Sequence, residues 1–392
     1  MPIVAEPIDQ VSLNGIDAVQ DWIHETQSHL RRIPIVGVLS NKGVFNDDEY
    51  LGDGDVMWRF NDRGIRSFCQ RIGFRFDQLA KLETPSLASQ VLNDLLQQNE
   101  IRSRLAEDEV VLDERTNTII GIVSRTYISY TNEQFLADIN QFLISLAKDD
   151  AFQFHEAYGI NTELTVRFRS EKRHGTIKGR GGAGEDRSLL GLDFQNSMVG
   201  TSSVRINYFL HRLVCANGMM VPAGKAINRV FHSGRDVSFQ DRLNRRLKEV
   251  VRKLDCLTSM LQALASRPFD PERLAQDNHT CRQVFEVIPA SKQTICEGEK
   301  LALRYASDAS EGEKGKMKRA HDAQVIGLIP KYFGGEFAAK VFETSFRDNA
   351  TMFDFVNVFT EYAKSRAPAQ RLEIEEKAGT LAKYIAENAR KF

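Results

Sequence analysis

The hydrophobic pattern of the chain changes near residue 236, and this change constrains the fold more than any other feature. Between residues 152 and 235, apolar and polar residues alternate in stretches such as LTVRFRS and SVRINYFLHRL. Alternation of this kind is typical of strands with one buried face. From Ser238 onward, apolar residues recur every three or four positions. The clearest case predicts one long amphipathic helix with a leucine-rich stripe: Leu243, Leu247, Val250, Leu254, Leu257, Leu261 and Leu264.

These patterns predict an α+β protein, in which an antiparallel hairpin-and-helix N-terminal and central portion precedes a mainly helical C-terminal portion. The strongest hairpin signal lies at residues 109–131, where two β-branched runs flank a polar turn. Apolar residues at helical spacing predict helices before residue 150 at 16–29, 61–72, 87–98 and 131–146. The same spacing predicts later helices at 291–306, 316–328, 335–347, 351–365 and 371–391.

Three segments follow from this organisation. Residues 1–54 contain an N-terminal helix and strands. Residues 55–235 form an α+β core with a basic, glycine-rich loop, and residues 236–392 form a helical C-terminal region. With 392 residues, of which 42% are hydrophobic and 27% charged, the chain has the composition of a globular protein that buries substantial cores.

The sequence shows no sign of secretion or membrane insertion. No apolar run approaches the roughly 18 residues that a membrane-spanning helix needs. The start, MPIVAEPIDQ, lacks the basic and apolar regions of a signal peptide. Five dispersed cysteines also argue against a disulfide framework. We therefore expect a cytoplasmic protein with no membrane partner.

The net charge of −1 hides a strong separation of charge along the chain. Residues 165–253 contain 18 Lys and Arg against 7 Asp and Glu, a balance of +11, and the rest of the chain has a balance of −12. A basic region of this kind suits a phosphate polymer, because each neutralised phosphate releases condensed counterions. The candidate nucleic-acid-binding residues are Arg167, Arg169, Lys172, Arg173, Lys178, Arg180, Arg205, Arg212, Lys225, Arg229, Arg245, Lys248 and Arg252.

Two further features of this region favour an unpaired strand. The glycines of GTIKGRGGAGEDRS, at residues 175–188, would let backbone N–H groups approach phosphates closely. Aromatic rings could stack on unpaired bases, and the candidates are Phe168, Tyr208, Phe209 and Phe231. The structural alternative is that these rings belong to the core and that strand arginines pair with neighbouring carboxylates. Both interpretations remain open at the level of sequence.

Motifs for catalysis are weak. The glycine-rich loop lacks the Gly-Lys-Ser/Thr ending of a nucleotide-binding P-loop. Cys215 lies in an apolar strand pattern, which suits a buried thiol better than a nucleophile. We expect no catalytic residue, no cofactor and no bound metal. One alternative is a metal-dependent nuclease in which Asp193, Glu163 and Lys172 converge.

Several segments together resemble a known family. FNDRGIRSFCQRIGF, IIGIVSRTYISYTNEQFLADI and NSMVGTSSVRINYFLHRLVCANGMM are similar to the phage/plasmid-related protein family named domain of unknown function nine-three-two (DUF932), over residues 55–235. The family positions Tyr127, Cys215 and Asn217 suit a packed ring, a buried thiol and a turn. The resemblance implies a role in mobile-DNA metabolism without an established activity. A weaker similarity to annealing proteins of the Rad52 and Erf type implies a basic groove and an oligomeric ring.

These observations lead to one leading hypothesis and two alternatives. The leading hypothesis is a non-enzymatic protein of a mobile genetic element that binds or anneals single-stranded DNA in recombination or replication, as a homo-oligomer. The first alternative is an interaction module whose leucine-striped helix forms an oligomer or docks on a host defence or replication protein. The second is the metal-dependent nuclease.

Overall fold

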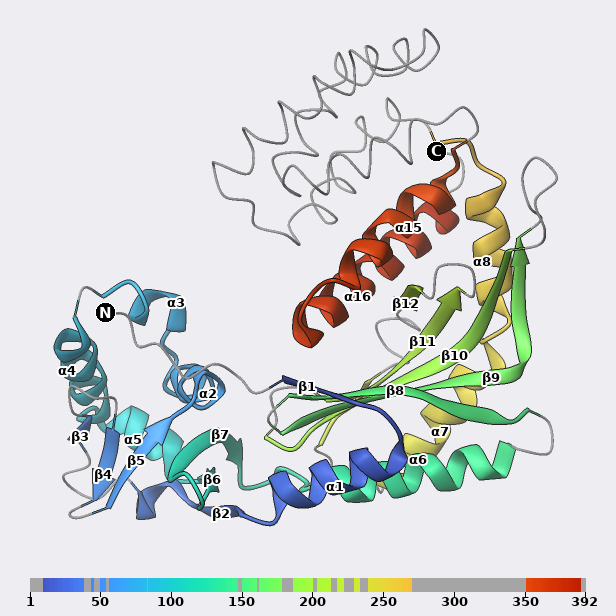
Figure 1. The fold of residues 1–392 in the computed structure, drawn as a ribbon. Helices are drawn as coiled ribbons and strands as arrows, with labels where there is room; N and C mark the ends of the chain where they lie inside the picture. The colour runs from blue at the N-terminus through green and yellow to red at the C-terminus, as the bar shows by residue number, and fades with distance from the viewer. Residues whose placement is uncertain are drawn as a thin grey trace, which may run out of the picture.

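The computed structural model describes residues 10–38, 44–45, 50–53, 56–82, 84–146, 150–160, 162–177, 186–199, 203–212, 217–221, 229–232, 239–269 and 350–388. Within these residues the chain forms two sheets, each with its own helices and its own main hydrophobic core (Figure 1). Antiparallel pairing dominates both sheets, so the predicted α+β class is confirmed.

The smaller sheet has six described strands, and its N-terminal residues fold as local patterns predict. The predicted hairpin is present, with Asn117 in its turn at φ 50°. The helix at Asp62 begins where the Asn61 side chain accepts a hydrogen bond from the N–H of Gly64, and it ends at Gly73, whose φ is 75°. The strand order is β2 (Leu30–Pro34), β6 (Asp108–Asp113), β7 (Thr118–Ser124), β5 (Val56–Phe60), β4 (Tyr50–Asp53) and β3 (Val44–Phe45).

Four helices pack with this sheet around a core of its own. Their buried residues include Phe68, Leu92 and Leu105. One strand pair, β5 with β7, is parallel, and the other pairs are antiparallel. The helices are α2 (Asp62–Ile72), α3 (Phe76–Leu79), α4 (Pro85–Leu96) and α5 (Asn99–Leu105), and a short 3₁₀ turn, η1 (Ile35–Gly37), follows β2.

The larger sheet has seven described strands and carries the basic region. It begins with an N-terminal strand that pairs with a strand from the middle of the chain. The order is β1 (Gln10–Leu13), β8 (Phe152–Ile160), β9 (Glu163–Ile177), β10 (Asp186–Ser197), β11 (Val204–Arg212) and β12 (Asn217–Val221), and β13 (Arg229–Val230) also pairs with β11. All of these pairs are antiparallel.

Helices cover the larger sheet on both faces (Figure 1). The helices α1 (Ile16–Gln27), α6 (Asn132–Leu146), α7 (Phe239–Arg252) and α8 (Cys256–Ala265) share a core with the sheet. The C-terminal helices α15 (Met352–Ala363) and α16 (Pro368–Glu387) belong to the same core. Helix α16 crosses β12 closely, because a Cβ atom at Gly379 would lie only 2.0 Å from the carbonyl oxygen of Met220.

The two sheets divide the chain differently from the predicted segments. The small-sheet unit, residues 30–124, is inserted between α1 and α6, both of which pack with the larger sheet. Likewise, α15 and α16 share the core of the larger sheet rather than forming a separate helical region. The expected boundaries near residues 54 and 236 therefore do not coincide with the described units, because β1 and the last two helices return to one sheet.

The predicted leucine stripe is buried along its whole length, but the prediction of one continuous helix is wrong. The chain forms α7 and α8 with a tight turn at 253–255 between them, in which Leu254 N–H bonds to Val251 C=O at 3.2 Å. The turn keeps the three-to-four spacing, so Leu254 stays fully buried. Because the stripe packs against the sheet, it is not an open surface for a partner.

The predicted helices at 351–365 and 371–391 correspond to α15 and α16, and those at 291–306, 316–328 and 335–347 lie outside the described residues. Within the described ranges, no helix has both the length and the apolar character needed to cross a bilayer.

Candidate nucleic-acid interface

The predicted basic residues separate into a buried residue, several paired ones and an exposed group. Lys178, Arg180 and Lys225 lie outside the described residues, as do most of the glycine-rich loop and Cys215. The remaining ten predicted cations lie on the larger sheet and on α7. Their exposure and their ion pairs decide which of them could meet a polyanion.

Arg167 is the clearest correction. Its side chain is fully buried on β9, so the prediction that it contacts phosphate is wrong. Three carboxylates surround its guanidinium: Glu156 at 2.8 Å, Asp193 at 2.9 Å and Glu375 of α16 at 2.6 Å. Burial works against the charge, but these carboxylates hold the pKa of Arg167 well above its usual value. Arg167 therefore joins three neighbouring strands and α16 through a buried ion cluster.

The residues around Arg167 complete this cluster. Its guanidinium lies 4.6 Å from the centre of the Phe209 ring, within the range of a cation–π contact. Burial raises the pKa of Glu156, but Arg167 and Arg371 outweigh burial and lower that pKa to about 2. Arg371 of α16 bonds to Glu375 at 2.9 Å and to Glu156 at 3.2 Å. The cluster is thus a polar bridge between sheet and helix, formed by residues from distant parts of the sequence.

Two further predicted cations also form structural ion pairs. Arg173 on β9 bonds to Asp150 at 2.8 Å and donates to the carbonyl of Val251 at 3.3 Å, which ties the sheet to the end of α7. Arg205 on β11 lies 3.6 Å from Glu376 of α16. Such pairs offer less charge to an external anion than unpaired cations do. Lys172 is exposed on β9, and Arg169 on the same strand is half-buried.

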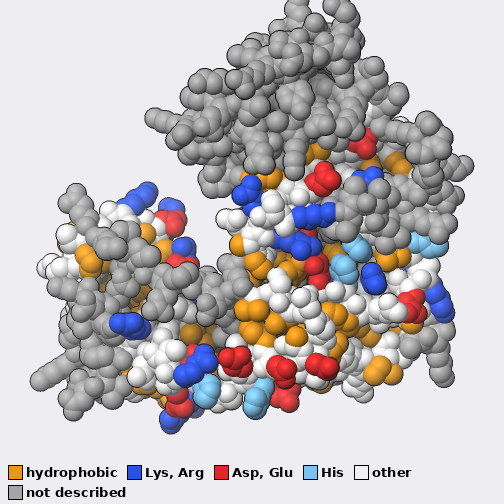
Figure 2. All heavy atoms as spheres, in the orientation of Figure 1, with side chains coloured by type: hydrophobic (Ala, Val, Ile, Leu, Met, Phe, Trp, Pro, Cys, Tyr) orange, Lys and Arg blue, Asp and Glu red, His pale blue; other side chains and the backbone are white. Residues whose placement is uncertain are grey.

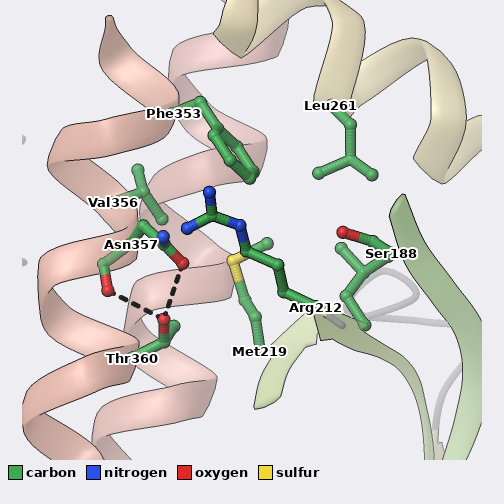
Figure 3. Close-up of a pocket in the computed structure, with 9 residues that line it drawn as sticks. Ser188, Arg212, Met219, Leu261, Phe353, Val356, Asn357 and Thr360 are labelled. Atoms are coloured by element: carbon green, nitrogen blue, oxygen red, sulfur yellow. Dashed lines mark hydrogen bonds between the residues drawn. The ribbon is translucent and has the colours of Figure 1, made fainter. Parts of the chain in front are cut away.

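Arg212 lies in a small hollow between the end of the sheet, α8 and α15 (Figure 3). Its guanidinium lies 5.3 Å from the centre of the Phe353 ring and points toward that ring and Asn357. The side chains of Leu261, Met219 and others close the hollow, and it has space for about one water molecule. This setting suits packing of the arginine stem more than contact with a polymer.

The exposed cations lie on the outer face of α7, opposite the leucine stripe, as the helical spacing predicts. Arg245, Lys248 and Arg252 are all exposed, whereas Leu243 and Leu247 are buried. None of these three cations forms an ion pair with a described residue. We call Arg245, Lys248 and Arg252 the α7 basic face.

The α7 basic face continues toward β13. Arg229 on that strand is exposed, and Arg242 of α7 donates a hydrogen bond to the carbonyl of Phe231 at 3.2 Å. The Phe231 ring itself is 63% exposed, which is unusual for phenylalanine. The prediction that three other rings stack on bases is wrong, because Phe168, Tyr208 and Phe209 are buried. Only one of the four aromatic candidates is therefore open to a base.

The residues of the alternative nuclease do not come together. Asp193 pairs with Arg167 in the buried cluster, and Glu163 pairs with Arg63 of α2 at 2.6 Å. Lys172 lies nine residues beyond Glu163 on β9, which is about 30 Å along a strand. Among the described residues, no group of three or more His, Cys, Asp and Glu side chains could hold a metal ion.

The sequence did not predict the junction of the two units, although the family position Tyr127 lies in it. Tyr127 donates a hydrogen bond to the carbonyl of Ser197 at 2.9 Å, and its ring stacks on His232 at 4.9 Å. A Cβ atom at Gly121 would lie 2.6 Å from Val199, so only glycine fits there. The family segment around Gly121 and Tyr127 thus packs the small sheet against the larger one.

The fold and its surface define an α+β protein with two sheet units, the smaller inserted into the larger, and with an exposed basic face on α7. The family model described as "Domain of unknown function (DUF932)" matches residues 119–385, and the chain belongs to this family. The match begins later than the resemblance suggested, at residue 119 rather than 55, and extends into the C-terminal helices. No curated protein and no solved structure matches the chain.

Proposed function

We propose that this protein binds nucleic acid along the α7 basic face and prefers single-stranded DNA. The observation that carries the proposal is the row of three exposed cations, Arg245, Lys248 and Arg252, none of which has a carboxylate partner in the described structure. A cation without a carboxylate partner is available to pair with a phosphate, and each phosphate that it neutralises releases condensed counterions, which favours binding.

The length of this row fits a phosphate chain. Residues 245 and 252 are seven positions apart, which is about 10 Å along a helix. Charges along a fully stacked strand recur about every 3.4 Å and lie further apart in an extended one, so the row can meet at most about three consecutive phosphates. Arg229 would extend the contact beyond the start of α7, where β13 packs against this helix.

The preference for a single strand rests on Phe231. Its ring is exposed, and its backbone carbonyl accepts a hydrogen bond from Arg242 of α7, the helix that carries the α7 basic face. A base can stack on such a ring only when it is unpaired, and stacking contributes about 1–3 kcal/mol per base. Replacing Phe231 by Ala should therefore weaken binding to single strands by roughly fivefold or more, with little effect on duplex binding.

Charge reversal tests the proposed surface. Fluorescence anisotropy would compare the wild type with a triple variant, R245E/K248E/R252E, on labelled single-stranded DNA, duplex DNA and RNA. The matched control, R75E/K81E/R104E, makes the same change of charge on exposed residues of the small-sheet unit. We expect the first variant to lose at least about tenfold in affinity and the control to stay close to the wild type. Equal losses in both variants would remove the assignment to α7.

The wider role follows from the family resemblance. We propose a role in recombination or replication of mobile DNA, in which a homo-oligomer anneals complementary strands. Annealing needs no nucleotide hydrolysis, so protein alone should speed the pairing of complementary oligonucleotides, as measured by energy transfer between end labels. Light scattering would give the oligomer size. A monomer that binds DNA without speeding annealing would limit the function to strand binding.

A further inference from the structure

The larger sheet carries a second polar site on the face opposite α7. On β11, Tyr208 faces α7 and α8. Burial raises the pKa of its hydroxyl, and Cys256 and Glu249 on these helices raise that pKa further. Its neighbours Phe209 and His211 point to the other face, that of Arg167 and α16. On the molecular surface, Lys, Arg and His side chains gather beside α16, with acidic groups between them (Figure 2).

Two histidines meet on this face. The rings of His155, on β8, and His211, on β11, lie 4.3 Å apart, although two strands separate them in the sheet. The strand pairing is irregular on both sides of this contact, and His155 itself lies at a register shift of β8 against β9. At Gly191, on the intervening β10, a Cβ atom would lie 2.2 Å from the carbonyl of Phe168, and the strand register shifts there. His211 also stacks on Phe209.

Two polar groups at this site have no hydrogen-bond or ion-pair partner among the described residues. His211 is 8% exposed, yet its Nδ1 atom has no hydrogen-bond partner in the described structure. A buried polar atom without a partner costs about 1–3 kcal/mol, and a water molecule, an ion or a ligand that bonds to it removes this cost. Arg169, on β9, is half-buried and forms no ion pair with a described residue. An unpaired guanidinium beside an unpaired imidazole is an arrangement that an anion would complete.

The surrounding charge selects an anion over a metal ion. Burial is the main cause that lowers the pKa of His211. Arg169 is the next largest influence and also lowers this pKa, as do Lys364 and Arg371, whereas Glu156 raises it. Burial is also the main cause that lowers the pKa of His155 to about 4; Glu156 opposes it, and Arg169 contributes to the decrease. Glu156 is itself paired with Arg167 and Arg371. Arg167 and Arg371 are thus compensated, whereas Arg169 has no carboxylate partner among the described residues, so the site keeps a positive charge that repels a metal ion and attracts an anion.

We infer that this face of the larger sheet binds a phosphate group between the guanidinium of Arg169 and the imidazole of His211. Arginine suits phosphate because its planar fork can donate two parallel hydrogen bonds. The phosphate comes from a free ion or from the end of a nucleotide chain. The site lies across the sheet from the α7 basic face, so it does not depend on the proposed DNA-binding function.

Calorimetry on the full chain tests this inference at constant ionic strength. The probes are inorganic phosphate, a 5′-phosphorylated dinucleotide and the same dinucleotide with a 5′-hydroxyl. The variants are R169Q, which removes the charge, and H211F, which keeps the ring stack but removes both nitrogens. The control is R125Q, which alters an exposed arginine of the turn after β7.

The wild type and R125Q should bind phosphate or the phosphorylated dinucleotide, but not the hydroxyl form. R169Q and H211F should each lose at least about tenfold in affinity. H211F should melt no earlier than the wild type without phosphate, because it removes the unpaired atom, which separates lost binding from lost folding. Tighter binding of the phosphorylated dinucleotide than of inorganic phosphate would identify a strand end as the source. Equal binding by all four proteins, or binding by none, would overturn the inference.

Discussion

Replacing Arg167 by Met should destabilise the protein more than most single substitutions. The guanidinium of Arg167 is the main positive charge facing Asp193 and Glu375, and all three side chains are fully buried. Removing one member of a buried ion pair costs about 3–5 kcal/mol, because the remaining charge loses its partner away from water. Domains are stable by only about 5–15 kcal/mol, so the loss should be easy to measure.

The loss of Arg167 would affect its carboxylate partners unequally. Without the arginine, Glu375 keeps the ion pair with Arg371 at 2.9 Å. Among the described residues, Asp193 then keeps only neutral donors, Gln195 at 3.0 Å and Asn207 at 3.4 Å. The uncompensated charge of Asp193 should therefore account for most of the cost. A second substitution, Asp193→Asn, should recover about 1–3 kcal/mol in the Arg167→Met background, because it removes that charge.

Urea unfolding followed by far-UV circular dichroism measures both effects at pH 7. We expect R167M to lose about 3–5 kcal/mol and the double variant R167M/D193N to lie between R167M and the wild type. D193N alone should also be destabilised, since it leaves Arg167 with one carboxylate fewer. A loss below about 1 kcal/mol in R167M, or no recovery in the double variant, would refute the ion cluster as a tie between sheet and helix.

Two further predictions concern close packing and pH. Gly379→Ala should destabilise the protein by about 1–3 kcal/mol in urea unfolding, because the new methyl group would meet the Met220 carbonyl. The control, Gly37→Ala, has open space around it and should be nearly neutral. Equal effects of the two substitutions would contradict the close approach of α16 to β12. Burial lowers the pKa of His232 from 6.5 to about 4, so the unfolded chain binds an extra proton between those values and the protein loses stability as the pH is lowered through them. His232→Phe should reduce the acid loss between pH 7 and pH 4.5 by about 2–3 kcal/mol, and an unchanged pH profile would contradict this.

Local periodicity predicted the elements and their buried faces well. The leucine stripe required only the spacing within one segment, and every one of its residues is buried. The helix at Asp62 was predictable from its two ends, because Asn61 and Gly73 have capping roles that depend on adjacent residues. The exposure of Arg245 and Lys248 follows from the same helical geometry.

Long-range pairing could not be predicted in this way. The sequence left open whether Arg167 meets phosphate or pairs with carboxylates, and it could not show that its partners Asp193 and Glu375 come from another strand and from the last helix. The pairing of β1 with β8, which makes the small sheet an insertion, has no local signal either. Glycines at 191 and 379 mark close approaches, but a glycine alone does not show what approaches it.

The salt dependence of single-strand binding tests the central claim most directly. A plot of the logarithm of affinity against the logarithm of salt concentration has a slope of about −0.7 for each phosphate contact on a single strand. If Arg245, Lys248 and Arg252 each neutralise one phosphate, the variant R245E/K248E/R252E should have a slope about 2 units shallower than the wild type, and R75E/K81E/R104E should keep the wild-type slope. Parallel lines for the wild type and R245E/K248E/R252E would contradict binding through the α7 basic face.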